Sequence, residues 1–310
     1  MLSFKQGQQI AEIEYKDSKK KPKILKVADE VTDEPEIVCN NLDDILPKSF
    51  YTGLKNVSTT NMILLKKAIR TQNKNLLLQG NNTLHDAYNI SNELLSELLK
   101  KNFYIPPSEG KINVIPMKES SRIGVFGASG VGKSYWIGQF LKQYKRRYKK
   151  NQIYVFSPIL DDSAFSESKP IYIRIDETIL NDLLSIEEFS NSCCIFDDIE
   201  SVKDKKVREA VLHFRDAVLE TGRHENITCM CVSHIILNGS ETKRLLNEAE
   251  EVVLFPRSNF NAIKNLCSRY YGMSRDDLNY IKQIGEKSRS ITIKRAFPTC
   301  IISEQNVRVI

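Results

Sequence analysis

The sequence predicts an α/β protein in which a mostly parallel sheet is flanked by helices, with a smaller N-terminal α+β region before it. Three observations support this fold class. From residue 115 onward, short apolar runs typical of strands alternate with stretches of helical periodicity, as in βαβ units. A glycine-rich turn at 127–134 joins one such run directly to one such helix. The run 104–110 contains two prolines and a glycine, which break both periodicities, so we divide the chain into regions 1–114 and 115–310.

The N-terminal region carries no chemical motif. Residues 9–15 and 23–27 partly alternate between apolar and polar side chains, which predicts two strands. The lysine-rich run 17–22 between them is interpreted as a solvated turn rather than a localisation signal. Helical spacing predicts helices over 61–69 and 90–99.

The second region is predicted to build the large sheet. Its predicted strands are 123–126, 153–156, 171–175 at an edge of the sheet, 192–196, 227–232 and 252–255. Its predicted helices are 135–141, 176–189, 202–220, 241–250 and 259–270. Ser274 and Asp277 resemble a capping box that begins one more short helix. Residues 290–294 and 300–302 are expected to pair as a closing hairpin around Pro298.

The glycine-rich turn matches the complete phosphate-binding motif G-x-x-x-x-G-K-S. The predicted binding residues are Gly127, Ala128, Ser129, Gly130, Val131, Gly132, Lys133, Ser134 and Tyr135. The glycines let the backbone approach a ligand closely, and the amides that follow them point into one concavity at a helix N-terminus. Lys133 can reach the β- and γ-phosphates, and the Ser134 hydroxyl can bind Mg²⁺. A chance lysine after a glycine-rich turn is disfavoured by the flanking strand and helix, so we expect ATP and Mg²⁺ to bind here.

Acidic residues follow the predicted strand 192–196. Such a strand places its carboxylates at the carboxyl edge of a parallel sheet, where ligands bind. Asp197 is the natural second ligand of Mg²⁺, and Asp198 stands where a carboxylate can activate the attacking water. Glu200 is the rival for that catalytic role. The alternative, an acidic turn with no function, is disfavoured beside an intact phosphate-binding loop.

A third pattern lies at 221–234, where a helix ends at Gly222 and an apolar strand ends in Ser233 and His234. His234 could sense the γ-phosphate, or simply end the strand. Arg223 precedes that strand, so it could reach a neighbouring subunit's phosphates more easily than its own, or be a surface residue. Arg215, on the preceding helix, is the alternative arginine.

Composition narrows the class of protein without identifying it. No run of eighteen apolar residues predicts a membrane span, and the first residues lack the apolar core of a secretory signal, so we do not expect secretion. The seven cysteines show no metal-ligand spacing and are interpreted as reduced core residues. The net charge of +6 is a weak indication of a polyanionic partner. The basic run 142–150 could contact DNA, but it is interpreted as a solvated helix end.

Residues 127–134, 193–198 and 222–234 together resemble the genome-packaging ATPases of poxviruses, giant viruses and virophages, which belong to the FtsK–HerA superfamily of DNA-pumping motors. The resemblance covers roughly residues 115–305 and says nothing of the first 118. It implies that Lys133, Ser134 and Asp197 bind Mg-ATP, that Asp198 is catalytic, and that Arg223 lies in the region that supplies an arginine between subunits. Where the superfamily commonly has a polar sensor such as glutamine, this chain has His234, which departs from that pattern.

The resemblance therefore implies an ATP-hydrolysing translocase of double-stranded DNA that packages a viral genome. It would act as a homo-oligomeric ring, expected to be a hexamer, with viral capsid proteins as partners, in the host cytoplasm at the virus factory or in the virion. Two alternatives stay open: a helicase or other nucleic-acid remodelling ATPase, and a nucleotide-gated scaffold with little turnover.

Overall fold

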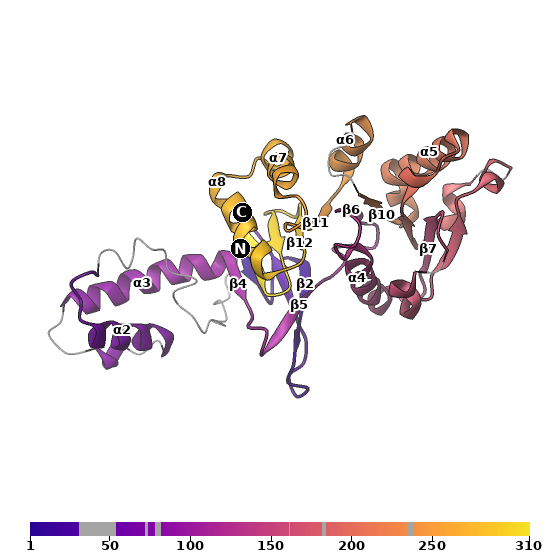
Figure 1. The fold of residues 1–310 in the computed structure, drawn as a ribbon. Helices are drawn as coiled ribbons and strands as arrows, with labels where there is room; N and C mark the ends of the chain where they lie inside the picture. The colour runs from indigo at the N-terminus through magenta and orange to yellow at the C-terminus, as the bar shows by residue number, and fades with distance from the viewer. Residues whose placement is uncertain (31–53, 72–73, 78–81, 161, 182–183, 235–238) are drawn as a thin grey trace.

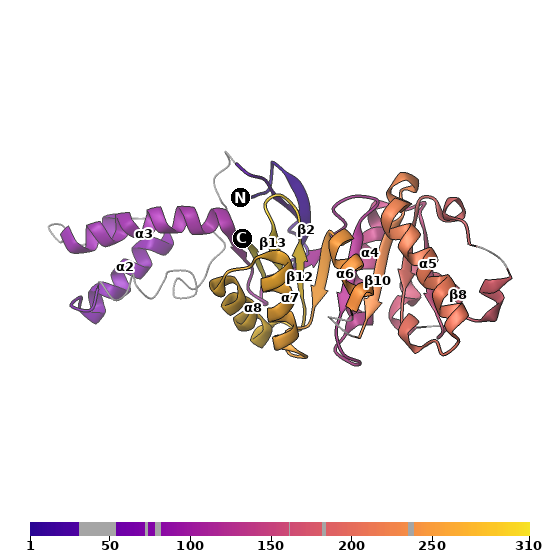
Figure 2. The same cartoon turned by 90° about the horizontal axis from the view of Figure 1, so that it is seen from above.

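A computed structural model of the chain describes residues 1–30, 54–71, 74–77, 82–160, 162–181, 184–234 and 239–310. Its centre is a ten-stranded sheet in the order β4-β14-β13-β12-β11-β6-β10-β9-β7-β8 (Figures 1 and 2). Six neighbouring strands from β11 to β8 run parallel, and the four strands at the other end are antiparallel. The predicted α/β fold with a mostly parallel sheet is therefore confirmed.

The parallel strands are β6 (Arg122–Phe126), β7 (Gln152–Ser157), β8 (Ile171–Arg174), β9 (Ser192–Phe196), β10 (Thr228–Ser233) and β11 (Glu251–Leu254). Strand β8 lies at the edge of the sheet, as predicted. The antiparallel strands are β12 (Ile291–Lys294), β13 (Cys300–Ile302), β14 (Asn306–Val309) and β4 (Asn102–Tyr104). The predicted hairpin around Pro298 is present, because β12 pairs with β13.

Helices cover both faces of this sheet (Figure 1). Helix α4 (Lys133–Arg147) packs on one face. The opposite face carries α5 (Lys205–Thr221), α6 (Gly239–Glu248), α7 (Phe260–Tyr271) and α8 (Arg275–Lys287). The predicted capping box opens α8, since the Ser274 hydroxyl accepts from the Asp277 amide and the Asp277 carboxylate accepts from the Ser274 amide. The central strands β6 and β9 are buried along their whole length because helices cover both faces of the sheet.

The predicted helix over 176–189 is wrong. The chain there forms two short 3₁₀ segments, η4 (Glu177–Leu180) and η5 (Ile186–Phe189), and residues 182–183 lie outside the described part. The Asp176 carboxylate accepts from both the amide and the hydroxyl of Thr178, and the Ser185 hydroxyl donates to Glu187. Such local side-chain bonds compete with the hydrogen bonds of a continuing α-helix. Further 3₁₀ turns are η2 (Lys74–Leu76), η3 (Ser163–Ser168), η6 (Ile199–Ser201) and η7 (Gly222–Glu225).

The N-terminal region contains a second, four-stranded sheet in the order β1-β3-β2-β5. Its strands are β1 (Leu2–Ser3), β2 (Gln8–Tyr15), β3 (Lys23–Val27) and β5 (Gly110–Val114). Helices α2 (Thr59–Thr71) and α3 (Asn82–Lys101) extend away from it with a small core of their own (Figure 2). The predicted strands and helices of this region are confirmed.

The two regions share a hydrophobic core. Ile10, Ile13 and Leu25 of the small sheet pack in one cluster with Phe103 of β4 and with Cys300, Ile302, Val307 and Val309 of the large sheet. Strand β4 is also paired to β14. The division into regions 1–114 and 115–310 stays a prediction, since the boundary crosses continuous packing.

A buried ion pair lies near the junction of the regions. Lys294 of β12 and Glu251 of β11 are fully buried and 3.1 Å apart, and the Lys294 ammonium also donates to the Ile115 carbonyl. Burial raises the pKa of the Glu251 carboxyl and lowers the pKa of the Lys294 ammonium. The charge of each residue opposes the pKa shift of the other. The hydrogen bond from Lys294 to Ile115 therefore holds residues 115–117, which follow β5, against the large sheet.

Six described cysteines are buried and free, and burial raises the pKa of Cys193, Cys194, Cys229, Cys267 and Cys300. The expectation of core cysteines holds for these six, and Cys39 lies outside the described residues. Within the described ranges, no helix is both long and apolar enough to cross a membrane.

Candidate active site

The phosphate-binding motif forms the turn between β6 and α4. Gly130 and Gly132 have φ angles of +75° and +108°, a region that side chains other than glycine rarely adopt. A Cβ added to Gly127 would lie 2.8 Å from Phe255 and 2.9 Å from Val131, so close packing also requires a glycine there. Helix α4 has no side-chain cap and no acid in its first turn, which leaves its N-terminal amides available to an anion.

The Lys133 ammonium is held inside this turn. It donates to the carbonyls of Gly127 at 2.7 Å and Ala128 at 3.1 Å. Burial lowers the pKa of Lys133, while the nearby charges of Asp197, Asp198 and Glu200 oppose that shift. The ammonium is therefore placed within the concavity where the motif needs a cation.

The acid-ended strand β9 is separated from β6 by one strand, β10, and both neighbours run parallel to β10. The Asp197 amide donates to the Phe156 carbonyl at 2.9 Å, which continues the ladder past the end of β9. Burial, then the neighbouring Asp198, raise the pKa of Asp197 to about 6, although Lys133 opposes this. Two carboxylates are thus crowded at the edge of the sheet, next to the phosphate-binding turn.

His234 connects the two halves of the site. Its Nδ1 lies 3.1 Å from the Lys133 ammonium, and its Nε2 lies 3.1 Å from Oδ1 of Asp198. Because an ammonium can only donate, Nδ1 of His234 must accept the hydrogen bond from Lys133. Nε2 then carries the hydrogen and donates a hydrogen bond to the Asp198 carboxylate, so His234 is the neutral Nε2–H tautomer. The structure brings together Lys133, His234 and Asp198 because of the strand order. Strand β10, which ends just before His234, lies between β6, which leads into the turn before Lys133, and β9, which leads to Asp198.

Asp198 and Glu200 are held differently. Asp198 adopts a left-handed backbone conformation with a φ of 57°, and its carboxylate turns toward His234. Left-handed backbone at a residue other than glycine is uncommon and is enriched at functional sites. Glu200 is exposed and accepts a hydrogen bond from the Ser233 hydroxyl. Asp198 is therefore linked to the lysine through His234, whereas Glu200 is bonded to Ser233.

The two candidate arginines lie in different places, and Arg215 of α5 lines a cavity together with Glu200 and Ser233. Arg223 is exposed in η7, just before β10 begins, and therefore lies toward the amino ends of the strands, opposite the phosphate-binding turn. Arg215 is buried in α5, where its guanidinium binds Oδ1 of Asp216 at 2.7 and 3.0 Å. Arg244 binds the other oxygen of Asp216.

The basic run 142–150 is largely paired within the chain. Lys142 binds Glu167 at 2.8 Å, and Arg146 and Arg147 both approach Glu12 of β2. The Lys145 ammonium donates to the Asn151 carbonyl at 2.6 Å. These contacts support the interpretation of this run as an ordinary helix end.

Sequence reasoning missed one residue beside the phosphate-binding turn. Arg289, between α8 and β12, lies against Gly132, where an added Cβ would be 2.9 Å from its Cδ. No local motif surrounds Arg289, so only the pairing of β12 with β11 brings it here. A lone serine-flanked arginine in the sequence gave no signal that could have identified it.

The oxygen donors of the site fit a magnesium ion. Ser134 supplies a hydroxyl from the first turn of α4, and Asp197 supplies a carboxylate. Hydroxyl, carboxylate and phosphate oxygens are the ligands that Mg²⁺ prefers. Burial, and after it the neighbouring Asp198, raise the pKa of Asp197, and a bound cation would favour its ionised form.

Comparisons with known proteins place this site in context. No family model matches the chain. The uncharacterized protein V3 of the Sputnik virophage is 35% identical over 191 residues, which covers 61% of this chain and 76% of V3. Among solved structures, the genome-packaging NTPase B204 of Sulfolobus turreted icosahedral virus 2 with ATP-γS has a TM-score of 0.42 at 13% identity, covering 61% of this chain and 98% of B204.

A crystal structure of B204, described as the DNA-packaging ATPase of Sulfolobus turreted icosahedral virus, has a TM-score of 0.41 at 14% identity. It covers 62% of this chain and 97% of B204. The resemblance indicated by the motifs is confirmed in sequence by V3, a virophage protein. The solved structures found to be similar include viral packaging NTPases.

Proposed function

The chain belongs to the same protein family as V3 of the Sputnik virophage, and from this membership and the geometry of the site we propose that it is an ATPase that packages viral DNA. One observation carries the proposal. The phosphate-binding lysine, a histidine and the acid after β9 form a continuous chain of contacts at 3.1 Å, beside a turn suited to phosphates. A glycine-rich turn without catalysis would not require this arrangement.

In the proposed reaction, the amides of the turn and of α4 hold the β- and γ-phosphates of ATP. The Lys133 ammonium exchanges its carbonyl partners, Gly127 and Ala128, for phosphate oxygens. Ser134 and Asp197 would hold Mg²⁺, which would neutralise charge on the phosphates.

Asp198 is proposed as the general base. A water molecule attacks the γ-phosphorus, the bond to the leaving oxygen of ADP breaks, and the water proton passes to the Asp198 carboxylate. The His234 Nε2–H donor orients that carboxylate, and its Nδ1 faces the lysine that binds the γ-phosphate. His234 can thereby link the presence of the γ-phosphate to the position of the base, the role of a sensor.

A ring assembly is proposed from the place of Arg223. A guanidinium at the amino ends of the strands cannot complete its own site, but it can stabilise charge in a neighbouring subunit's site. A homo-oligomeric ring, a hexamer in our proposal, would also enclose double-stranded DNA and present it to capsid proteins. We place this activity in the host cytoplasm at the virus factory or in the virion.

Steady-state ATP hydrolysis by the full chain, measured without DNA, with single-stranded DNA and with long duplex, tests the proposal. We expect Mg²⁺-dependent turnover that long duplex stimulates most. Greatest stimulation by single strands would favour a helicase. ATP binding without turnover under all three conditions would favour a nucleotide-gated scaffold and overturn the ATPase proposal.

A further inference from the structure

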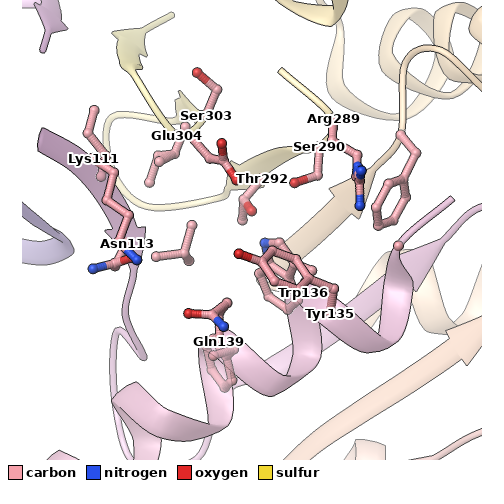
Figure 3. A pocket seen from close by; sticks show the side chains of 16 residues that line it. Lys111, Asn113, Tyr135, Trp136, Gln139, Arg289, Ser290, Thr292, Ser303 and Glu304 are labelled. Atoms are coloured by element: carbon pink, nitrogen blue, oxygen red, sulfur yellow. The ribbon is translucent and has the colours of Figure 1, made fainter. Parts of the chain in front are cut away.

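A cleft opens beside the phosphate-binding turn, on the side of β6 that faces β11 and β12 rather than Asp197 and Asp198 (Figure 3). About 670 Å³ of space lies between its walls, a volume that includes solvent at the open mouth. Three walls form it: the start of α4 with Tyr135 and Gln139, strand β5 with Asn113, and the segment around β12 with Arg289 and Thr292. The catalytic groups and this cleft thus lie on opposite sides of one turn.

Thr292 gives the cleft an unsatisfied polar group. Its side chain is 1% exposed, and its hydroxyl has no hydrogen-bond partner in the part of the chain that the structure describes. Its neighbours Ile291 and Ile293 pack with α7 and α8 on the opposite face, so strand alternation turns Thr292 toward the cleft. A buried hydroxyl without a partner reduces stability, and a ligand in the cleft would supply that partner.

The mouth of the cleft offers flat groups to a ligand. Tyr135 is 54% exposed although it directly follows Ser134, and its ring stands at the opening (Figure 3). Arg289 lies against Gly132 and, as far as the described residues go, its guanidinium has no ion-pair partner. An aromatic ring and a guanidinium both stack on planar ring systems.

We propose that this cleft binds the ribose and base of the nucleotide, and that β5 of the N-terminal region forms one wall of the nucleotide site. The inference rests on the proposed function. With the γ-phosphate near Lys133 and Asp198, the phosphate chain must leave the turn on the other side, past Gly132 and Tyr135, and the nucleoside then enters the cleft. The Thr292 hydroxyl bonds to its polar edge.

The wall from β5 is braced by the small sheet. The Asn113 side-chain amide donates to Glu14 of β2 at 2.7 Å, and Lys111 forms an ion pair with the same carboxylate at 3.4 Å. These bonds lower the pKa of Glu14, the Asn113 bond contributing most. The N-terminal region is thereby an element of the nucleotide site rather than an appendage to it.

Calorimetric titration of the full-length protein with Mg-ATP and with Mg-tripolyphosphate tests this inference. Tripolyphosphate carries the phosphates without a nucleoside. Thr292→Val and Asn113→Ala should each weaken ATP binding about fivefold, the value of one hydrogen bond, and Tyr135→Ala about tenfold. All three should bind tripolyphosphate as the wild type does.

Matched controls distinguish a binding role from a structural one. Thr299→Val, in the same β12–β13 hairpin with its hydroxyl bonded to the Ala296 carbonyl, and Tyr270→Ala, an exposed tyrosine of α7, should leave ATP affinity unchanged. Without ligand, Thr292→Val should melt at or above the wild-type temperature, because it removes an unpaired buried hydroxyl. Weaker ATP binding together with undiminished stability is the expected signature of a binding residue.

Unchanged ATP affinity in the Thr292, Asn113 and Tyr135 variants would overturn the nucleoside site and leave the ATPase proposal standing. Equal losses for ATP and tripolyphosphate would also overturn it, because the effect would then lie on the phosphates. If the wild type bound tripolyphosphate and ATP equally, no nucleoside site would exist. A wild type that bound neither would refute the proposed function itself.

Discussion

Asp197 lies in a crowded acidic environment, and its raised pKa couples nucleotide binding to pH. With a pKa of about 6 in the folded chain and an ordinary value near 3.8, the folded state holds a proton between these values that the unfolded state has lost. The contribution of Asp197 to the free energy of unfolding therefore falls as pH rises through this range. The proposed binding of Mg²⁺ requires the ionised form of Asp197, so protons and Mg²⁺ would compete.

We expect Mg-ATP affinity to fall by up to about tenfold for each pH unit below 6, measured by calorimetry. Asp197→Asn should bind Mg-ATP weakly at every pH, and it should raise the melting temperature of the ligand-free protein at pH 7.5. Affinity that stays constant from pH 7 to pH 5 would contradict the assignment of Asp197 to the metal.

Asp198 and Glu200 can be separated by their partners. Asp198→Asn should retain ATP binding, because the proposed Mg²⁺ ligand Asp197 is unchanged. It should lower kcat by a factor on the order of 10² or more, because the proposed base is lost. Glu200→Gln keeps a hydrogen bond to Ser233 and should lower kcat only slightly. Normal turnover by Asp198→Asn with loss in Glu200→Gln would transfer the catalytic role to Glu200. Lys133→Ala, which removes the phosphate contact, serves as the inactive reference.

At the scale of elements, the two arginines have opposite surroundings. Arg223→Ala changes an exposed residue, so we expect unchanged melting and ATP affinity with loss of hydrolysis. Arg215→Ala leaves Asp216 without its buried partner and should cost about 3 kcal/mol of unfolding free energy, although Arg244 remains to offset part of the loss. Thermal melting and turnover of both variants decide which arginine is structural.

Mixing experiments test whether Arg223 acts between subunits. Arg223→Ala and Lys133→Ala are each expected to be inactive alone. Together they should recover some hydrolysis, because certain interfaces then pair an intact arginine with an intact phosphate-binding turn. Absence of recovery at every mixing ratio, in assemblies shown by mass to contain both variants, would exclude an arginine supplied by a neighbour.

The elements near the catalytic groups could be predicted because their signals are local. The turn at 127–134, the acids after β9 and the end of β10 are each encoded within a few consecutive residues, and the structure brings them together. The cleft could not be predicted, since Asn113, Arg289 and Thr292 come from distant segments that meet only through strand pairing. The 3₁₀ segments η4 and η5 were missed because helical spacing alone does not reveal competing side-chain bonds.

At the scale of the whole molecule, the N-terminal region and the large sheet depend on one another. Removing residues 1–114 would uncover Ile302, Val307 and Val309, which pack with Ile10, Ile13 and Phe103, and would delete β4. We expect the fragment 115–310 to aggregate or to lose cooperative unfolding, as followed by circular dichroism and light scattering. A soluble fragment with full ATP affinity would contradict both this prediction and the role of β5.

The proposed contact with DNA would be a property of the assembled molecule. A packaging motor must grip the phosphate backbone without reading sequence, and such contacts weaken with salt through counterion release. We expect duplexes of any sequence to stimulate ATP hydrolysis, with stimulation decreasing as salt rises from about 50 to 200 mM. Stimulation should also increase with duplex length. Equal stimulation by heparin, with no ATP-driven movement in single-molecule assays, would argue against translocation.

The pairing of β4 with β14 has a consequence for how the protein is made. Tyr104 faces Asn306 in that pairing, so β4 must wait for a strand that lies 202 residues later in the chain (306 − 104). Until then β4 presents an unpaired edge, and the apolar side chains beneath it stay uncovered. Thr292 and Arg289 also emerge late, so a nascent chain can form the glycine-rich turn well before it can complete the cleft. The order of synthesis would thus delay the proposed nucleotide binding until β12 has been made.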